Sequence, residues 1–310
     1  MKKRIFDALI ILAFLILLLE ILVNKRLVTD TISYSLNVWV TSVLPSLFPF
    51  FIISDVLISY NITNYIPKRL KKTFCHLFHI NEALLTVFFL SCVSGFPSNA
   101  RNTRTLYDLG LITKEEASHI LMFTHFSNPL FILSTVAVSF LHQERYGILI
   151  LISHYLGNVI LGIFLRNTVS IRDLHYMTAK EKSQSFSQIL IQAIRSSIDT
   201  LLMILGTLTC FLLVSSLLIN RLDIGMYSSA ILKGILEITM GLKSLSLLPI
   251  GDIYKVVIST MFISFGGLSV HLQVLSQLVD TDIAYHPFFV ARVCHALLSG
   301  GICYLLFVFF

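Results

Sequence analysis

Long apolar runs recur along this chain, and they decide what it can fold into. Residues 5–23 form one such run, and residues 201–219 form another. A helix needs about 20 apolar residues to cross the hydrocarbon core of a bilayer. Of the 310 residues, 55% are hydrophobic and 13% are charged, whereas soluble domains carry about 25% charged residues. The sequence therefore predicts an all-α polytopic membrane protein with roughly eight transmembrane segments.

The clearest interruption follows the apolar run at 83–93, which is too short to cross a bilayer. Gly95 permits a sharp backbone bend, and Pro97 cannot continue the preceding helix. Ser98 and Asn99 can then cap a new helix. The sequence therefore predicts a re-entrant hairpin, in which two half-helices enter the membrane and return to the same side.

The stretch at 264–271 has the same shape, with Gly266 aligned to Gly95 and Ser269 aligned to Ser98. Broken helices in corresponding halves of a membrane protein are a good sequence pointer to its substrate site. The start of a half-helix presents unpaired N–H groups and the positive end of the helix dipole, which favour an anion. We therefore expect the two breaks to face each other inside the membrane and to bind a small anionic solute.

Polar residues at the two breaks add to this predicted site. Arg101 lies one turn into the new helix and would supply positive charge, and His271 holds the matching place in the second half. A nucleoside is the alternative guest, because its ring would stack and its hydroxyls would bond Asn and Ser side chains. The predicted binding residues at the breaks are Ser94, Gly95, Pro97, Ser98, Asn99, Arg101, Gly266, Gly267, Ser269 and His271.

Three further polar residues lie within apolar segments, where such residues usually face a bundle interior or a cavity. Asn128 stands in the segment 120–141, which is expected to cross the membrane, and we assign it to the site. Glu237 has two readings: a functional role, or an ion pair with Lys233 one helical turn earlier. Gln273 completes the predicted binding set.

Loops rich in Lys and Arg, at 67–79 and 166–186, favour the cytoplasmic side of the membrane. Pro45 and Pro49 leave backbone carbonyls without helical partners, which predicts a broken element near the site. We expect an N-terminal transmembrane helix at 1–30, a first repeat at 31–165, a cytoplasmic linker and interfacial helix at 166–197, and a second repeat at 198–310.

Motifs and charge argue against several other classes of protein. The sequence lacks HExxH, GxSxG, GxxxxGK[ST] and GxGxxG patterns, so no enzyme activity, catalytic residue or cofactor is expected. The five cysteines lack CxxC spacing, and no closed set of four ligands is evident, so no metal site is predicted. The net charge of +6 sits mostly in short loops that orient membrane helices, so it does not indicate nucleic-acid binding.

The residues Ser94-Gly95-Phe96-Pro97, followed by Ala100-Arg101, resemble the SGYPxGAK-type motif of the sporulation integral membrane protein YlbJ family. That family belongs with the Gate-type proteins, which are related to nucleoside transporters and to the membrane part of ferrous-iron transporters. The similarity extends from about Leu44 onwards, and residues 264–273 are its most specific part. Asn99 stands where the family pattern has Gly, and Arg101 stands where it has Lys.

The resemblance implies two inverted Gate-type repeats and a role in spore formation. The protein would move a small solute, with dipicolinate as the candidate, across a bacterial membrane that surrounds the developing spore. The competing reading is a membrane scaffold that transports nothing and recruits other spore-assembly proteins. The expected partners are the lipid bilayer, a small anionic solute, and either a second copy of this chain or other sporulation membrane proteins.

Overall fold

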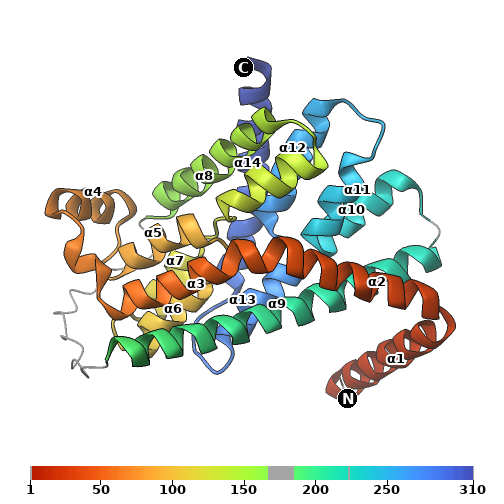
Figure 1. The fold of residues 1–310 in the computed structure, drawn as a ribbon, viewed down its shortest axis with the longest axis horizontal. Helices are drawn as coiled ribbons and strands as arrows, with labels where there is room; N and C mark the ends of the chain where they lie inside the picture. The colour runs from red at the N-terminus through yellow and green to blue at the C-terminus, as the bar shows by residue number, and fades with distance from the viewer. Residues whose placement is uncertain (1, 167–184, 223, 310) are drawn as a thin grey trace.

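The computed structural model describes residues 2–166, 185–222 and 224–309, and these residues form helices without a strand (Figure 1). Six helical segments among them are long and apolar enough to cross a membrane: Arg4–Val23, Lys25–Ser59, Glu144–Leu165, Phe186–Leu222, Asp252–Leu278 and His286–Phe309. Two further apolar helices, Leu84–Ser94 and Phe131–Phe140, are shorter. The all-α membrane architecture is therefore confirmed, whereas eight crossings and two inverted repeats stay predictions.

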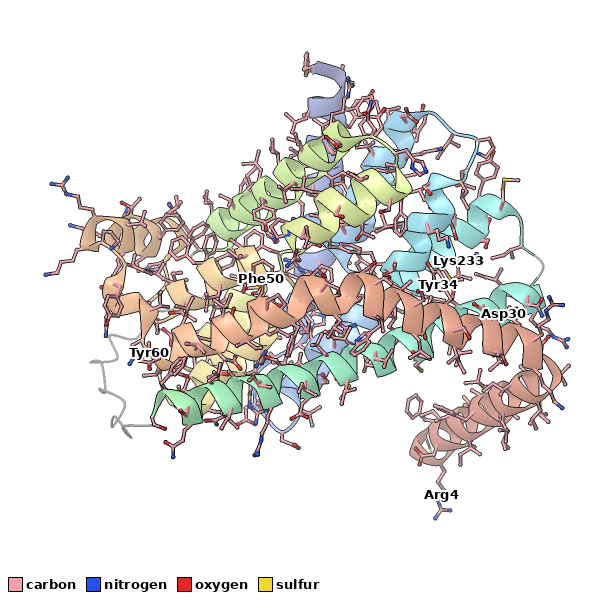
Figure 2. The ribbon with its side chains drawn as sticks, viewed as in Figure 1. Arg4, Asp30, Tyr34, Phe50, Tyr60 and Lys233 are labelled. Carbon is pink, nitrogen blue, oxygen red and sulfur yellow. The ribbon has the colours of Figure 1, made fainter. Side chains whose placement is uncertain are left out.

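The first helix, α1 (Lys2–Val23), lies apart from the main bundle (Figure 1). None of its apolar window is buried inside the protein, and Figure 2 shows its side chains projecting on all sides. A helix that is hydrophobic all round is stable only when an apolar medium surrounds it. The length and surface of α1 therefore suit a membrane crossing.

The next segment combines α2 (Lys25–Val38), the π-helical turn η1 (Trp39–Val43) and α3 (Leu44–Ser59). It stays helical through Pro45 and Pro49, so the broken element predicted there was wrong. The π-turn precedes the first proline, and the Ser46 hydroxyl donates to the Ser42 carbonyl at 2.6 Å. The π-turn shifts the hydrogen-bond register before Pro45, and the Ser46 hydroxyl supplies an extra donor there, so the helix continues.

Five short helices follow: η2 (Ile62–Tyr65), α4 (Lys68–Phe78), α5 (Leu84–Ser94), α6 (Ser98–Asp108) and α7 (Lys114–Leu121). α5 and α6 have 11 residues each and pack against each other. At 1.5 Å per residue each is only about 16 Å long, which is too short to cross a bilayer. The two short helices expected on either side of the break are therefore present, whereas their re-entry into the membrane stays a prediction.

The segment 120–141 is not one continuous helix, and its crossing of the membrane stays a prediction. α7 ends at Leu121, residues 122–130 are irregular as far as Asn128 and helical at 129 and 130, and the π-helix η3 (Phe131–Phe140) and α8 (Glu144–Leu165) follow. The Asn128 side-chain oxygen accepts the Leu130 N–H at 2.8 Å, and Pro129 has no N–H to donate. These two residues end the irregular stretch locally and start η3.

The second half contains α9 (Phe186–Leu222), α10 (Met226–Leu236), α11 (Ile238–Ser246), α12 (Asp252–Phe265), α13 (Gly267–Leu278) and α14 (His286–Phe309). α9 has 37 residues and packs along α2 and α3 (Figure 1). The interfacial helix predicted within 166–197 is the first part of α9, which continues without a break because no Gly or Pro interrupts the sequence there. Residues 167–184 of the predicted linker lie outside the described residues.

Candidate functional site

The first predicted break is present at residues 95–97, between α5 and α6. Gly95 has φ +78°, and a Cβ built on it would lie 2.5 Å from the backbone nitrogen of Asn128. Only glycine can adopt this conformation and allow this approach without displacing the neighbouring chain. The first break therefore lies directly against the irregular stretch 122–130.

The second predicted break is present at Gly266, between α12 and α13. Gly266 has φ +92°, and a Cβ on it would lie 3.0 Å from Nε2 of His125. The His125 ring stacks on Phe96 of the first break, with ring centroids 4.8 Å apart. Both breaks therefore contact the same stretch, which lies between them.

A third interruption, which the sequence analysis did not predict, separates α10 from α11 at Glu237. This residue has an extended backbone, and its carboxylate accepts the N–H groups of Thr239 at 3.0 Å and Met240 at 2.8 Å. The predicted ion pair with Lys233 is absent, because the helix ends between the two residues and they no longer share a face. Of the two readings of Glu237, the structure therefore removes the ion pair.

The third interruption joins the second break through backbone contact. A Cβ on Gly267, whose φ is +66°, would lie 3.2 Å from the backbone nitrogen of Ile238. The start of α13 thus packs on the start of α11. Two helix N-termini converge there, and each carries about half a positive charge from its dipole. Glu237 caps α11, whereas no side chain caps α13.

A cavity of about 60 Å³ lies where these interruptions meet. Its polar lining residues are Ser46, Ser127, Asn128, Glu237, Thr239, Ser269 and Gln273, and its apolar wall includes Phe96 and Phe131. A water needs about 10–15 Å³ of such space, whereas drug-sized ligand pockets have about 300–1,000 Å³. The cavity therefore holds a volume that suits a few waters, and a larger guest requires the helices to move.

Four of the sequence-predicted binding residues line this cavity: Asn128, Glu237, Ser269 and Gln273. The other nine do not, and they are Ser94, Gly95, Pro97, Ser98, Asn99, Arg101, Gly266, Gly267 and His271. The glycines and Pro97 form the turns that place their neighbours. The side chains of the remaining residues have other surroundings, which divide into three groups.

The predicted cap of α6 is not formed by Ser98 or Asn99. Pro97 occupies the N-cap position, and the Ser98 hydroxyl accepts bonds from Ser94 at 2.7 Å and Asn102 at 3.2 Å. The prediction of these caps was wrong because the Pro97 carbonyl and the Gly95 carbonyl already accept the first amides of the helix. The fully buried amide of Asn99 has no hydrogen-bond partner among the described residues.

Arg101 turns away from the cavity and forms an ion pair with Asp55 of α3, a residue that the sequence analysis missed. Its guanidinium also donates to the Ser196 hydroxyl of α9 at 2.8 Å. The Asp55 carboxylate thus compensates the positive charge of Arg101. The anion-binding potential at the cavity therefore comes from helix N-termini rather than from this guanidinium.

His271 bonds the Phe265 carbonyl through Nε2 at 3.0 Å and the Tyr285 hydroxyl through Nδ1 at 2.7 Å. A carbonyl can only accept, so Nε2 carries the proton and Nδ1 accepts from Tyr285. Burial raises the pKa of Tyr285 to about 12, so this hydroxyl stays protonated and remains a donor at neutral pH. The neutral imidazole thus satisfies both contacts, and His271 has a structural place beside the second break.

The chain is similar to the sporulation integral membrane protein YlbJ of Bacillus subtilis (strain 168). The two sequences are 30% identical over 328 aligned positions, which cover 94% of this chain and 80% of the Bacillus subtilis protein. This chain belongs to the YlbJ family. No family model and no solved structure matches it. Family membership and the six candidate spans together make it an integral membrane protein.

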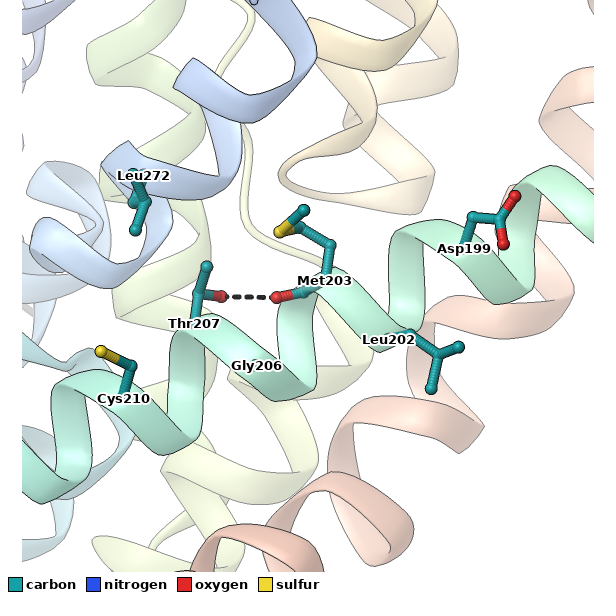
Figure 3. A pocket seen from close by; sticks show the side chains of 7 residues that line it. All are labelled: Asp199, Leu202, Met203, Gly206, Thr207, Cys210 and Leu272. Atoms are coloured by element: carbon teal, nitrogen blue, oxygen red, sulfur yellow. Dashed lines mark hydrogen bonds between the residues drawn. The ribbon is translucent and has the colours of Figure 1, made fainter.

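In this YlbJ-family protein a second, larger hollow lies beside the central cavity. This groove of about 480 Å³ is lined by Asp199, Leu202, Met203, Gly206, Thr207 and Cys210 of α9 and by Leu272 of α13 (Figure 3). The Thr207 hydroxyl accepts a hydrogen bond from the Gln273 amide at 3.1 Å. Thr207 lines the groove and Gln273 lines the cavity, so this one hydrogen bond forms part of the wall between them.

Behind the cavity, the YlbJ-family chain holds a buried cluster of basic side chains that the sequence analysis did not assign. Arg292 of α14 donates to the Met122 carbonyl, to Asn158 at 3.2 Å and to Nδ1 of His295 at 2.9 Å. His154 accepts the Ser127 N–H at 2.9 Å. These contacts hold the irregular stretch in place. The sequence did contain one indication of this cluster, because Arg292 is a charged residue within an apolar run.

Proposed function

We propose that this protein moves a small anion across a membrane during spore formation, with dipicolinate as the candidate. The observation that carries the proposal is the cavity at which three interrupted segments meet, with the uncapped start of α13 in its wall. The spore-formation part rests on the relative, whose name describes a sporulation integral membrane protein. We propose transport without catalysis, metal or cofactor.

The charges around the cavity support an anionic guest. Glu237 already acts as an internal anion at the start of α11, where its oxygens bond two amides. The neighbouring start of α13 has no such side chain, although Ser269 at its third position lines the cavity. A guest carboxylate placed there would gain amide hydrogens, the helix dipole and a hydroxyl. A neutral nucleoside is the alternative guest, because Phe96 and Phe131 offer rings on the wall.

The test is dipicolinate uptake into vesicles that contain the full chain. Ser269→Ala removes one hydroxyl from the cavity wall, so we expect uptake to fall about fivefold, as for the loss of one hydrogen bond of about 1 kcal/mol. Ser139→Ala is the matched control, because Ser139 is exposed on η3 and lies outside the cavity. Equal uptake by both variants and the unchanged protein would contradict the proposed site, and competition by a nucleoside alone would favour the alternative guest.

A scaffold role is the second candidate, and the exposed basic helix α4 favours it. Lys68, Arg69 and Lys72 are exposed there, and α4 projects from the edge of the bundle (Figure 1). Neutralising these three charges should abolish a scaffold that recruits acidic partners. A transporter with its site at the central cavity should keep its uptake in the same variant, so this single variant separates the two functions.

A further inference from the structure

Glu237 is the only charged side chain that lines the central cavity among the described residues. Its side chain is 1% exposed, and no described Lys, Arg or His nitrogen lies within 4.0 Å of its carboxylate. Two backbone N–H groups and the Thr239 hydroxyl are its hydrogen-bond donors. The carboxylate therefore faces the cavity without a counter-ion.

The surrounding elements leave this carboxylate without a compensating cation. From α2, the Tyr34 hydroxyl is near enough to feel its charge, and Lys243 of α11 lies over the Tyr34 ring at 4.6 Å (Figure 2 labels Tyr34). The Lys233 carbonyl of α10 accepts the Glu237 N–H. Among the titratable or charged residues on the other packed elements, four are engaged elsewhere or lie in the groove: His271 of α13, Asp252 and Lys255 of α12, and Asp199 of α9. η3 contributes no titratable residue.

The charge balance of the cavity depends on the protonation of Glu237. The starts of α11 and α13 together carry about one positive charge, which an ionised Glu237 cancels. A cavity that is neutral in this state has little to offer an anion. With Glu237 protonated, the same two helix starts leave the cavity positive. Two carboxylates that share so small a site cannot both stay ionised, so a guest carboxylate and a Glu237 carboxylate exclude each other.

We propose that Glu237 takes up one proton when the anion binds, so that the protein is an anion–proton symporter. This inference rests on the proposed function. The proton adds to one carboxylate oxygen of Glu237 as the anion arrives from the same side, and both leave together on the other side. Protonation also removes the negative charge of Glu237 and makes one of its oxygens a hydroxyl donor, so the bonds from the Thr239 and Met240 N–H groups lose their charge assistance and weaken. The start of α11 is then held less tightly, which couples the proton to widening of the small cavity.

Dipicolinate binding to the detergent-solubilised full chain tests the linkage between pH 6 and pH 8. Carboxylic acids ionise near pH 4, so the guest itself keeps its charge over this range. If binding takes up one proton, the dissociation constant rises up to about tenfold per pH unit wherever Glu237 is ionised in the free protein. Glu237→Gln should flatten this slope, and Glu237→Asp should keep it. Glu115→Gln is the control, because Glu115 is exposed on α7.

The coupling is measured in vesicles that contain the unchanged protein and a trapped pH-sensitive dye. We expect an inward dipicolinate gradient to acidify the lumen, and an inward proton gradient to raise dipicolinate accumulation about tenfold for each unit of pH difference. Dipicolinate movement with neither a pH slope nor lumen acidification would overturn the coupling and leave the proposed function standing. No dipicolinate movement under any gradient would overturn both. Because these measurements use the unchanged chain, they decide the question even if a Glu237 variant fails to fold.

Discussion

Gly95 and Gly110 share a positive φ, yet they differ in what surrounds them. Gly95 has φ +78°, and a Cβ built on it would lie 2.5 Å from the backbone nitrogen of Asn128. Gly110 has φ +70°, and a Cβ built on it would have no atom within 4 Å. An alanine at either position is strained by the positive φ, and at Gly95 the ψ of −178° lies in a region that is essentially restricted to glycine. Only at Gly95 would the added methyl group also collide with another backbone, so Gly95 is restricted both by its conformation and by its packing.

We therefore expect Gly95→Ala to lower the free energy of unfolding by about 2 kcal/mol more than Gly110→Ala does, because overpacking of a tight contact adds about 1–3 kcal/mol. Thermal or denaturant unfolding of both variants in the same detergent measures the difference. Equal destabilisation would show that the first break does not press against Asn128. Gly95→Ala should also reduce uptake, since Asn128 lines the cavity.

At the scale of elements, the local chemistry of Gly and Pro made two interruptions predictable and left the one at Glu237 hidden. Gly95 with Pro97, and Gly266 with Gly267, announce a change of backbone direction by themselves. The break at Glu237 has no such residue, because a side chain reaching forward to Thr239 and Met240 caps α11. Pro45 and Pro49 led to the opposite error, a predicted break that is absent, because the helix continues through them after a π-helical turn.

The groove on α9 gives the elements a testable role in the path of the solute. Cys210 lines this groove, and Cys294 of α14 is equally free and exposed but lines neither hollow. If solute approaches the cavity past Thr207 and Gln273, a maleimide attached to Cys210 should block uptake severalfold. Cys210→Ser should protect uptake from the reagent, and Cys294→Ser should not. The reverse pattern would exclude the groove as the path.

The whole molecule depends on contacts that no local pattern encodes. The membrane class follows from composition alone, and two of the three interruptions that meet at the cavity follow from glycine turns. The meeting of these turns at residues 122–130 requires Arg292, which is 170 residues from its partner Met122. The pairing of Arg101 with Asp55 and that of Gln273 with Thr207 also span separate elements. Such pairings are decided by the packed fold, so the sequence showed candidate residues without showing which of them share a cavity.

Arg292 is the residue through which this long-range organisation can be tested. It is fully buried, and its planar guanidinium reaches the Met122 carbonyl, Asn158 and His295 at once. A lysine keeps the charge but has no planar fork, so Arg292→Lys loses at least one of these bonds and leaves buried acceptors unpaired. Hydrogen bonds to charged groups contribute about 1.5–3 kcal/mol each, so we expect the free energy of unfolding to fall by about 2 kcal/mol or more. Arg145→Lys, at an exposed position on α8, should change it by less than about 0.5 kcal/mol. His154 and His295 would lose their anchor, although the side chains that line the cavity are all unchanged. Arg292→Lys should therefore also reduce uptake. Unchanged uptake with unchanged stability would mean that the stretch 122–130 holds its shape without α14.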